Sequence, residues 1–129
     1  MQDAQVTASI IGEGSLLKAC SIHHCVLGVR SRVEDEVVLQ DTLVMGADYF
    51  ESSEERLLLR ERGGIPIGVG RGSTVKRAII DKNVRIGDNV TIVNKDHVEE
   101  ADRPELSFYI RNGIVVVVKN GTIADGTVI

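Results

Sequence analysis

The 129-residue sequence predicts an all-β fold, a parallel β-helix in which short strands wind into stacked coils. Aliphatic residues recur at intervals of six, and Gly, Asn and Asp fall between them, where tight turns need a positive φ. Aromatic residues make up only 3% of the chain, so the interior has to be built from Ile, Val and Leu. This length suits a single domain.

The six-residue interval is clearest in the second half of the chain. The ladders there are Ile80, Ile86, Ile92 and Val98; Val84 and Val90; and Val117, Ile123 and Ile129. The first half carries Ile10, Leu16 and Ile22, with Ile11 and Leu17 beside them. A longer repeat overlies these, because "SIIG" at 9–12 returns sixteen residues later as "CVLG" at 25–28. Helices need apolar residues at three- and four-residue steps, so the pattern favours strands. A β-sandwich is the alternative, but it would need longer strands and hairpin turns.

Residues 47–64, "ADYFESSEERLLLRERGG", depart from the repeat and predict a short inserted helix around 52–62. Ser52 or Ser53 supplies the N-cap, and two glycines end the segment. Charges that suit the helix dipole flank it: Glu54 and Glu55 in the first turn, Arg60 and Arg62 in the last. We expect the leucines at 57–59 to cover part of the solenoid's side.

A second interruption, "NKDHVEEADRPEL" at 94–106, is polar and predicts a loop with one helical turn. Neither end of the chain carries a finished cap, since "GTVI" closes it on an apolar residue in register. We therefore expect a piece of a larger protein, or a protein that oligomerises through its ends and faces.

The segment "CSIHHC" at 20–25 brings two cysteines and two histidines together. In a strand, successive side chains point to opposite faces. If Ile22 points inward, Cys20 and His24 share its face, whereas His23 and Cys25 face away. The two thiols then diverge, so this segment alone builds no tetrahedral metal site. Cys25 takes the place of Ser9 in the longer repeat.

Enzymes built on six-residue repeats offer an alternative interpretation of these histidines. Acyltransferases use a histidine base, and zinc carbonic anhydrases use three histidine ligands across a trimer. Either would make His23 or His24 a catalytic candidate. The interrupted repeat and the total of three histidines argue against both. The third, His97, lies in the polar loop, and we expect it to be solvated.

Composition excludes other classes of function. A net charge of −4 gives no basic footprint for nucleic acid. The sequence has no signal peptide and no apolar run of the roughly 20 residues that span a bilayer, so we expect no membrane partner. Two cysteines argue against a structural disulfide and favour a cytoplasmic location.

Two lysines lie in predicted turns, Lys82 in "DKN" and Lys119 in "KNGT". Turn lysines are ordinarily just solvated. If these two converge on one edge, two ammonium groups beside Asn and backbone N–H groups would form a site for a small phosphorylated acid. Such a site would be sensitive to salt.

Several longer runs carry a resemblance to a known family over essentially the whole chain. They are "IIGEG", "IHHCVLGVRS", "DTLVMGADYFE", "IPIGVG", "KRAIIDKNVRIGDNVTIVNKD" and "GIVVVVKNGTI". Together they resemble the C-terminal domain of ADP-glucose pyrophosphorylase (glucose-1-phosphate adenylyltransferase), most closely its cyanobacterial and plant branch. "MGADYFE" and "RAIIDKNVRIGDNV" are the specific runs, because other six-residue-repeat proteins share only the periodicity.

The resemblance implies a left-handed β-helix that packs on a catalytic domain and takes part in tetramer assembly. It implies a parent enzyme that makes ADP-glucose and pyrophosphate from ATP and glucose 1-phosphate with Mg²⁺, for glycogen or starch synthesis. In this branch the regulators are 3-phosphoglycerate, an activator, and inorganic phosphate, an inhibitor. Lys82 and Lys119 match two lysines of the family's activator region, so the resemblance assigns effector binding to both. A plant origin would place the protein in the plastid stroma.

The sequence departs from the family in one large respect. The Gly-rich nucleotide-binding loop and sugar-phosphate residues of the family's N-terminal domain have no counterpart in residues 1–129. We therefore expect residues 1–129 to be a regulatory and assembly domain with no catalytic residue, metal or cofactor of its own. The Met before "QDAQ" suggests a separately expressed domain. A stand-alone acyltransferase and an oligomerisation module without a ligand remain the alternatives.

Overall fold

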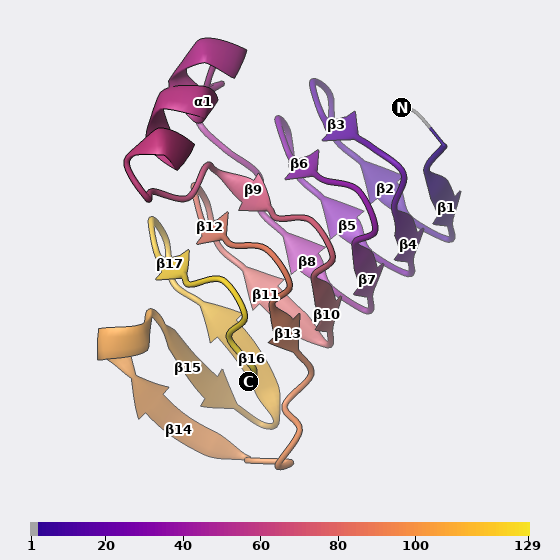
Figure 1. Cartoon of the computed structure of the whole chain (residues 1–129). Coiled ribbons are helices and arrows are strands. Elements are labelled where there is room, and N and C mark those ends of the chain that lie inside the picture. Colours follow the sequence, from indigo (N-terminus) through magenta and orange to yellow (C-terminus); the bar gives the residue numbers. More distant parts are fainter. Residues whose placement is uncertain (1–2) are drawn as a thin grey trace.

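Figure 1 shows the computed structural model, which describes residues 3–129 as a solenoid of stacked coils. Three sheets run along its length, and each complete coil contributes one strand to each sheet. The first sheet holds β1 (Gln5–Thr7), β4 (Ser21–His23), β7 (Val38–Gln40), β10 (Thr74–Lys76) and β13 (Thr91–Ile92). The second holds β2 (Ile10–Ile11), β5 (Val26–Leu27), β8 (Leu43–Val44), β11 (Ala78–Ile80) and β16 (Ile114–Val117), followed by β15 (Phe108–Arg111) and β14 (Glu100–Arg103). The third holds β3 (Leu16–Leu17), β6 (Arg32–Val33), β9 (Gly68–Val69), β12 (Arg85–Ile86) and β17 (Thr122–Ile123).

The strand register confirms the predicted parallel β-helix. Ile10 pairs with Val26 and Ile11 with Leu27, both in parallel, so the sixteen-residue repeat is one turn of the solenoid. From Ser21 to Val38 the next turn takes seventeen residues. Backbone groups are paired from coil to coil, which is how a chain of two- and three-residue strands satisfies its N–H and C=O groups.

The core is the inward column of aliphatic side chains. The second-half ladders point inward as predicted: Ile80, Ile86, Ile92, Val84, Val90, Val117 and Ile123 are buried, and Val98 and Ile129 are partly buried against the core. The first-half ladder is wrong for Ile10 and Leu16, which point outward, while Leu17 is buried. A coil of sixteen or seventeen residues is shorter than three steps of six. At least one step per turn is therefore shorter than six residues, and counting by six moves onto the outer face.

Helix α1 (Ser53–Glu61) confirms the predicted insertion, which leaves the solenoid between β8 and β9 (Figure 1). Ser52 is the N-cap, and its hydroxyl accepts the backbone N–H of Glu55 at 3.1 Å. The Glu55 carboxylate in turn accepts the backbone N–H of Ser52 at 3.2 Å, which completes a capping box. The expected role of the leucines is wrong for Leu57 and Leu58, which are exposed, while Leu59 is half-buried. Arg56 is the buried residue of the helix.

The second interruption is only partly a loop. Its predicted helical turn is the 3-10 helix η1 (Pro104–Leu106), but β14 before it pairs antiparallel with β15. Since β15 also pairs with β16, this hairpin extends the second sheet past the last coil (Figure 1). The expectation of an uncapped end was wrong for this sheet. Strand β14 is mostly exposed on both faces, so it gives no apolar alternation to detect.

The segment 20–25 follows the predicted alternation only as far as His23. Cys20 and Ile22 are buried, as expected. His24 has a φ of 54° and forms a corner, so the chain turns there and Cys25 points inward while His24 is exposed. The prediction that the two thiols diverge is therefore wrong. Both are free and buried, and burial raises the pKa of each. Cys25 does occupy the position of Ser9, whose hydroxyl accepts its backbone N–H at 3.0 Å.

Candidate functional site

Lys82 and Lys119 lie at the same place in two successive coils. Ile80 pairs with Val117. Lys82 lies two residues after Ile80, and Lys119 lies two residues after Val117. The backbone N–H of Asn120 donates to the carbonyl of Lys82 at 2.9 Å, which stacks the two turns directly. Adjacent strands lie about 4.8 Å apart, so the two ammonium groups can reach one small ligand. We call the stacked turns 46–48, 81–83 and 118–121 the lysine edge.

Asparagine shapes both lysine turns. Asn83 and Asn120 have φ values of 59° and 61°, in the left-handed region that Asn tolerates better than most residues. Each asparagine can therefore take the left-handed position after its lysine, where a glycine would otherwise be needed. A third turn stacks on the first, because the backbone N–H of Asn83 donates to the carbonyl of Gly46 at 3.0 Å. Gly46 has a φ of 88°, and a Cβ there would collide with the carbonyl of Val29.

The buried side chain of Asn83 ties the three turns together. Its amide nitrogen donates to Asn120 Oδ1 at 3.2 Å and to Asp48 Oδ2 at 3.1 Å. Its oxygen accepts the backbone N–H of Asp48 at 2.9 Å. One amide thus uses both donors and its acceptor in holding the lysine edge, which fixes the turns relative to one another.

Asp48 supplies the negative charge of the lysine edge. Its Oδ1 lies 3.1 Å from Lys82 Nζ in an exposed ion pair. Hydrogen bonds from Asn83 and Lys82 hold the pKa of the Asp48 carboxyl below its usual value, and the charges of Lys82 and Lys119 act in the same direction. Lys119 belongs to the turn stacked directly on that of Lys82, so the fold brings a second cation to the same edge. A cluster of two cations and an amide donor around one carboxylate has the chemistry of an anion-binding site.

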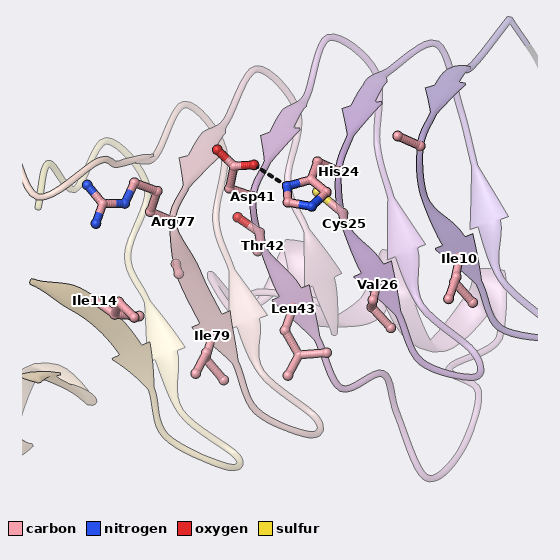
Figure 2. Close-up of a pocket in the computed structure, with 12 residues that line it drawn as sticks. Ile10, His24, Cys25, Val26, Asp41, Thr42, Leu43, Arg77, Ile79 and Ile114 are labelled. Carbon is pink, nitrogen blue, oxygen red and sulfur yellow. Dashed lines mark hydrogen bonds and ion pairs between the residues drawn. The ribbon is translucent and has the colours of Figure 1, made fainter. Parts of the chain in front are cut away.

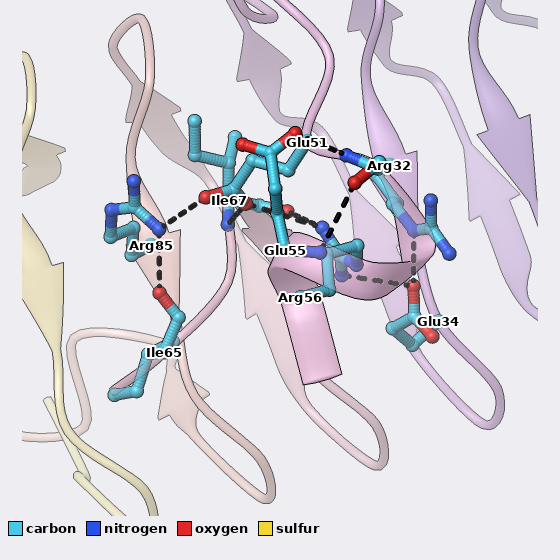
Figure 3. A network of polar contacts seen from close by, with 9 residues as sticks. Arg32, Glu34, Glu51, Glu55, Arg56, Ile65, Ile67 and Arg85 are labelled. Atoms are coloured by element: carbon cyan, nitrogen blue, oxygen red, sulfur yellow. Dashed lines mark hydrogen bonds and ion pairs between the residues drawn. The ribbon is translucent and has the colours of Figure 1, made fainter. Parts of the chain in front are cut away.

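A buried ionic network joins Glu51, which lies just before helix α1, to Arg56 of the helix and to Arg85, as Figure 3 shows. Arg56 Nη1 donates to the carbonyl of Ile67 at 2.8 Å and lies 3.5 Å from Glu51. Glu51 also lies 2.9 Å from Arg85 of β12 and accepts the backbone N–H of Ile67 at 2.7 Å. Residue 51 is three positions from Asp48, so the helix, the third sheet and the lysine edge form one connected structure.

Charge pairing and burial oppose each other in this network. Burial lowers the pKa of Arg56 to about 10, and the nearby Arg32 guanidinium adds to this, against the attraction of Glu34 and Glu51. The side chain still carries its charge at neutral pH. Burial alone would raise the pKa of Glu34, but hydrogen bonds from Lys18 and Arg32 outweigh it and hold the pKa below its usual value.

The second sheet carries an aliphatic outer face. Ile10, Val26, Leu43 and Ile79 pair in register on four successive strands and point the same way, as Figure 2 shows. They line a shallow groove of about 640 Å³ that continues to Ile114. A row of polar corner residues, His24, Asp41 and Arg77, borders it. A continuous apolar strip on the outside of a sheet is typical of a packing surface.

The histidines are exposed, and two of them take part in separate side-chain contacts. His23 Nδ1 lies 2.6 Å from the hydroxyl of Thr7, and His24 Nδ1 lies 2.6 Å from Asp41. His97 is exposed, as expected. Within residues 3–129, no three His, Cys, Asp or Glu side chains are grouped so that they could hold a metal ion. No helix in the same range is long and apolar enough to cross a bilayer.

The sequence predicts the two lysines as candidates, and the structure adds Asp48 beside them. The missing signal was the coil register: Ile79 pairs with Leu43, and Ile80 with Val44, across the inserted helix. Once β8 and β11 are known to be neighbours, Gly46 and Asp48 follow as the turn beside Asn83. The sequence separates these turns by more than thirty residues, so periodicity alone could not join them.

Comparisons with known proteins agree with this architecture. Residues 1–128 match the family described as the GLGC left-handed parallel beta-helix domain, which gives the handedness of the coil. The small subunit of glucose-1-phosphate adenylyltransferase, chloroplastic/amyloplastic, from Triticum aestivum is 54% identical over 127 residues. That alignment covers 98% of this chain and 27% of the wheat protein, so the chain spans about a quarter of its relative's length.

Proposed function

Because the chain belongs to the GLGC left-handed parallel β-helix family, we propose that it is the C-terminal regulatory and assembly domain of a glucose-1-phosphate adenylyltransferase. The parent enzyme would make ADP-glucose and pyrophosphate from ATP and glucose 1-phosphate. Its catalytic residues and Mg²⁺ would belong to a separate N-terminal domain. The wheat relative is named as chloroplastic/amyloplastic, which supports a plastid location if the source is a plant. For any other source, a cytoplasmic location stays a prediction.

The observation that carries the regulatory role is the pairing of Lys82 with Lys119 on adjacent turns. Two ammonium groups within reach of one ligand suit a phosphoryl group, and the amide of Asn83, which here donates to Asp48, lies beside them. The proposed ligands are 3-phosphoglycerate as the activator and inorganic phosphate as the inhibitor. Because the site lies on an exposed edge, a neighbouring domain or subunit could complete it, and we expect weak binding by the chain alone.

Assembly would use the aliphatic face of the second sheet. Ile10 is 68% exposed and Val26 is 43% exposed, so this strip costs free energy while it faces water. We propose that it packs on the catalytic domain or on a neighbouring subunit of a homotetramer. An effector at the lysine edge would then act by binding two arrangements of the domains with different affinity.

The decisive experiment is activation of the full-length enzyme carrying Lys82→Glu or Lys119→Glu. Each substitution reverses one charge of the pair. The concentration of 3-phosphoglycerate that gives half-maximal activation should rise by about tenfold or more, a loss of about 1.4 kcal/mol. Lys76→Glu, at an exposed position on the first sheet, is the matched control and should change little. Unchanged activation in both test variants would contradict the assignment of effector binding to Lys82 and Lys119.

A further inference from the structure

The lysine edge is occupied by a carboxylate of the chain itself. Asp48 places one oxygen 3.1 Å from Lys82 Nζ and the other 3.1 Å from the amide nitrogen of Asn83. These are the donors that a bound phosphoryl group would use. The backbone of Asp48 is fixed separately, since its N–H donates to Asn83 Oδ1 at 2.9 Å. The carboxylate is therefore held at the anion position by the fold.

We propose that Asp48 is a resident competitor, whose carboxylate must leave Lys82 and Asn83 before a phosphoryl group can bind, so that the site favours dianions over monoanions. This inference rests on the proposed function of the lysine edge and names the class of ligand that the edge accepts.

Local charge explains the selectivity. Four charged groups meet here: Lys82, Lys119, Asp48 and Asp81, whose carboxylate accepts the backbone N–H of Lys82 at 2.6 Å. A monoanion that displaces Asp48 merely exchanges one negative charge for another. It also competes with a carboxylate that is tethered and so has a high effective concentration. A dianionic phosphate brings one more charge to the two lysines and gains from both.

The displacement itself requires little rearrangement. The side chains of Asp48 and Lys82 are each 44% exposed, and ion pairs at such positions contribute little. Rotation of the Asp48 side chain into water breaks the two carboxylate contacts but keeps the backbone bond to Asn83. The turn at 46–48 can therefore stay in place while the carboxylate leaves.

The test is the affinity of the full-length protein for inorganic phosphate, measured by calorimetry at constant ionic strength. Asp48→Asn keeps the size and the backbone contact of the residue but removes its charge. We expect it to tighten phosphate binding about fivefold and to make chloride a better competitor. Asp96→Asn, which removes an exposed charge elsewhere, should have no effect. Asp48→Ala should behave like Asp48→Asn and guards against a misfolded variant.

Two outcomes separate this inference from the proposed function. If Lys119→Gln weakens phosphate binding while Asp48→Asn leaves it unchanged or weaker, the lysine edge remains the phosphate site. The proposal that Asp48 competes with phosphate is then wrong. If Lys119→Gln has no effect on phosphate affinity, or if neither the wild type nor Asp48→Asn binds phosphate, the lysine edge is not the effector site. Both the proposed function of the edge and the proposed competition by Asp48 are then wrong.

Discussion

Asn83 illustrates how much of the candidate site depends on one side chain. It is buried, has a positive φ and bonds through its side chain to both neighbouring turns. The "DKN" run predicts a turn with Asn in the left-handed conformation. It does not predict the side-chain bonds, because these depend on which turns of other coils lie above and below. The lysine between Asp81 and Asn83 is in the same situation: its turn follows from the sequence, whereas its carboxylate partner does not.

Asn83→Ala should destabilise the chain by about 2–4 kcal/mol, because it leaves polar groups unpaired and puts Ala in a left-handed turn. Asn83→Gly removes the same hydrogen bonds but tolerates the backbone conformation, so it should cost about 1–2 kcal/mol less than Asn83→Ala. Urea unfolding of the two variants measures both effects, the loss of the hydrogen bonds and the cost of the left-handed conformation. Equal stabilities would show that the conformation of this turn contributes nothing.

At the scale of elements, helix α1 was predictable in itself but not in its docking. Its caps and terminal charges are local signals, and the capping box of Ser52 and Glu55 forms as the residue types suggest. Its orientation is tertiary. Three consecutive leucines suggested the buried face, but an ionic network with the third sheet holds the helix through Arg56 instead. A charged residue that is buried because its partners lie on other coils gives no pattern in the sequence.

Arg56→Ala should therefore destabilise the chain by about 2–3 kcal/mol, since it removes a charged hydrogen bond to Ile67 and one partner each of Glu34 and Glu51. Leu57→Ala, at the next position of the same helix, is the matched control. Leu57 is 58% exposed, so its removal should change the free energy of unfolding by less than about 0.5 kcal/mol. A larger effect at Leu57 than at Arg56 would contradict the docking described here.

The same network predicts a response to acid. The folded pKa of Glu34 lies below its usual value, so its carboxylate stabilises the fold at pH values above the unfolded pKa of about 4.3. That contribution is lost as the pH falls through the folded pKa. Glu34→Gln should cost about 1.5–3 kcal/mol at pH 7, and this difference from wild type should shrink below pH 4.3. Urea unfolding at several pH values measures this difference in the free energy of unfolding. A difference that grows in acid would contradict a stabilising role for the ionised Glu34 carboxylate.

At the scale of the whole molecule, periodicity predicts the solenoid, but it does not predict which residues pair between successive coils. Turns of sixteen and seventeen residues follow one another, and two insertions interrupt the count. This is why the outward Ile10 looked like a core residue and why the hairpin of β14 and β15 looked like a loop. The handedness came from family resemblance, because spacing is the same for either hand.

The aliphatic face of the second sheet should matter for assembly and not for the fold of the chain. Leu43 is 38% exposed and points outward, so Leu43→Lys should change the free energy of unfolding of the chain by less than about 1 kcal/mol. In the full-length protein it should weaken the subunit or domain packing that we propose, which analytical ultracentrifugation would detect as a smaller assembly. Val38→Lys, which has a similar exposure on the first sheet, should leave the assembly intact. Equal effects of the two variants would argue against the second sheet as the packing face.

The central claim is that the lysine edge binds phosphate, and a phosphate titration of the ¹⁵N-labelled chain followed by NMR tests it most directly. Weak binding is enough, because chemical shifts report it in the millimolar range. With chloride at equal ionic strength as the reference, the largest shifts should fall on the backbone amides of 46–48, 81–83 and 118–121. Shifts that are absent at tens of millimolar phosphate, or that centre on the His24 and Arg77 corners instead, would contradict the account.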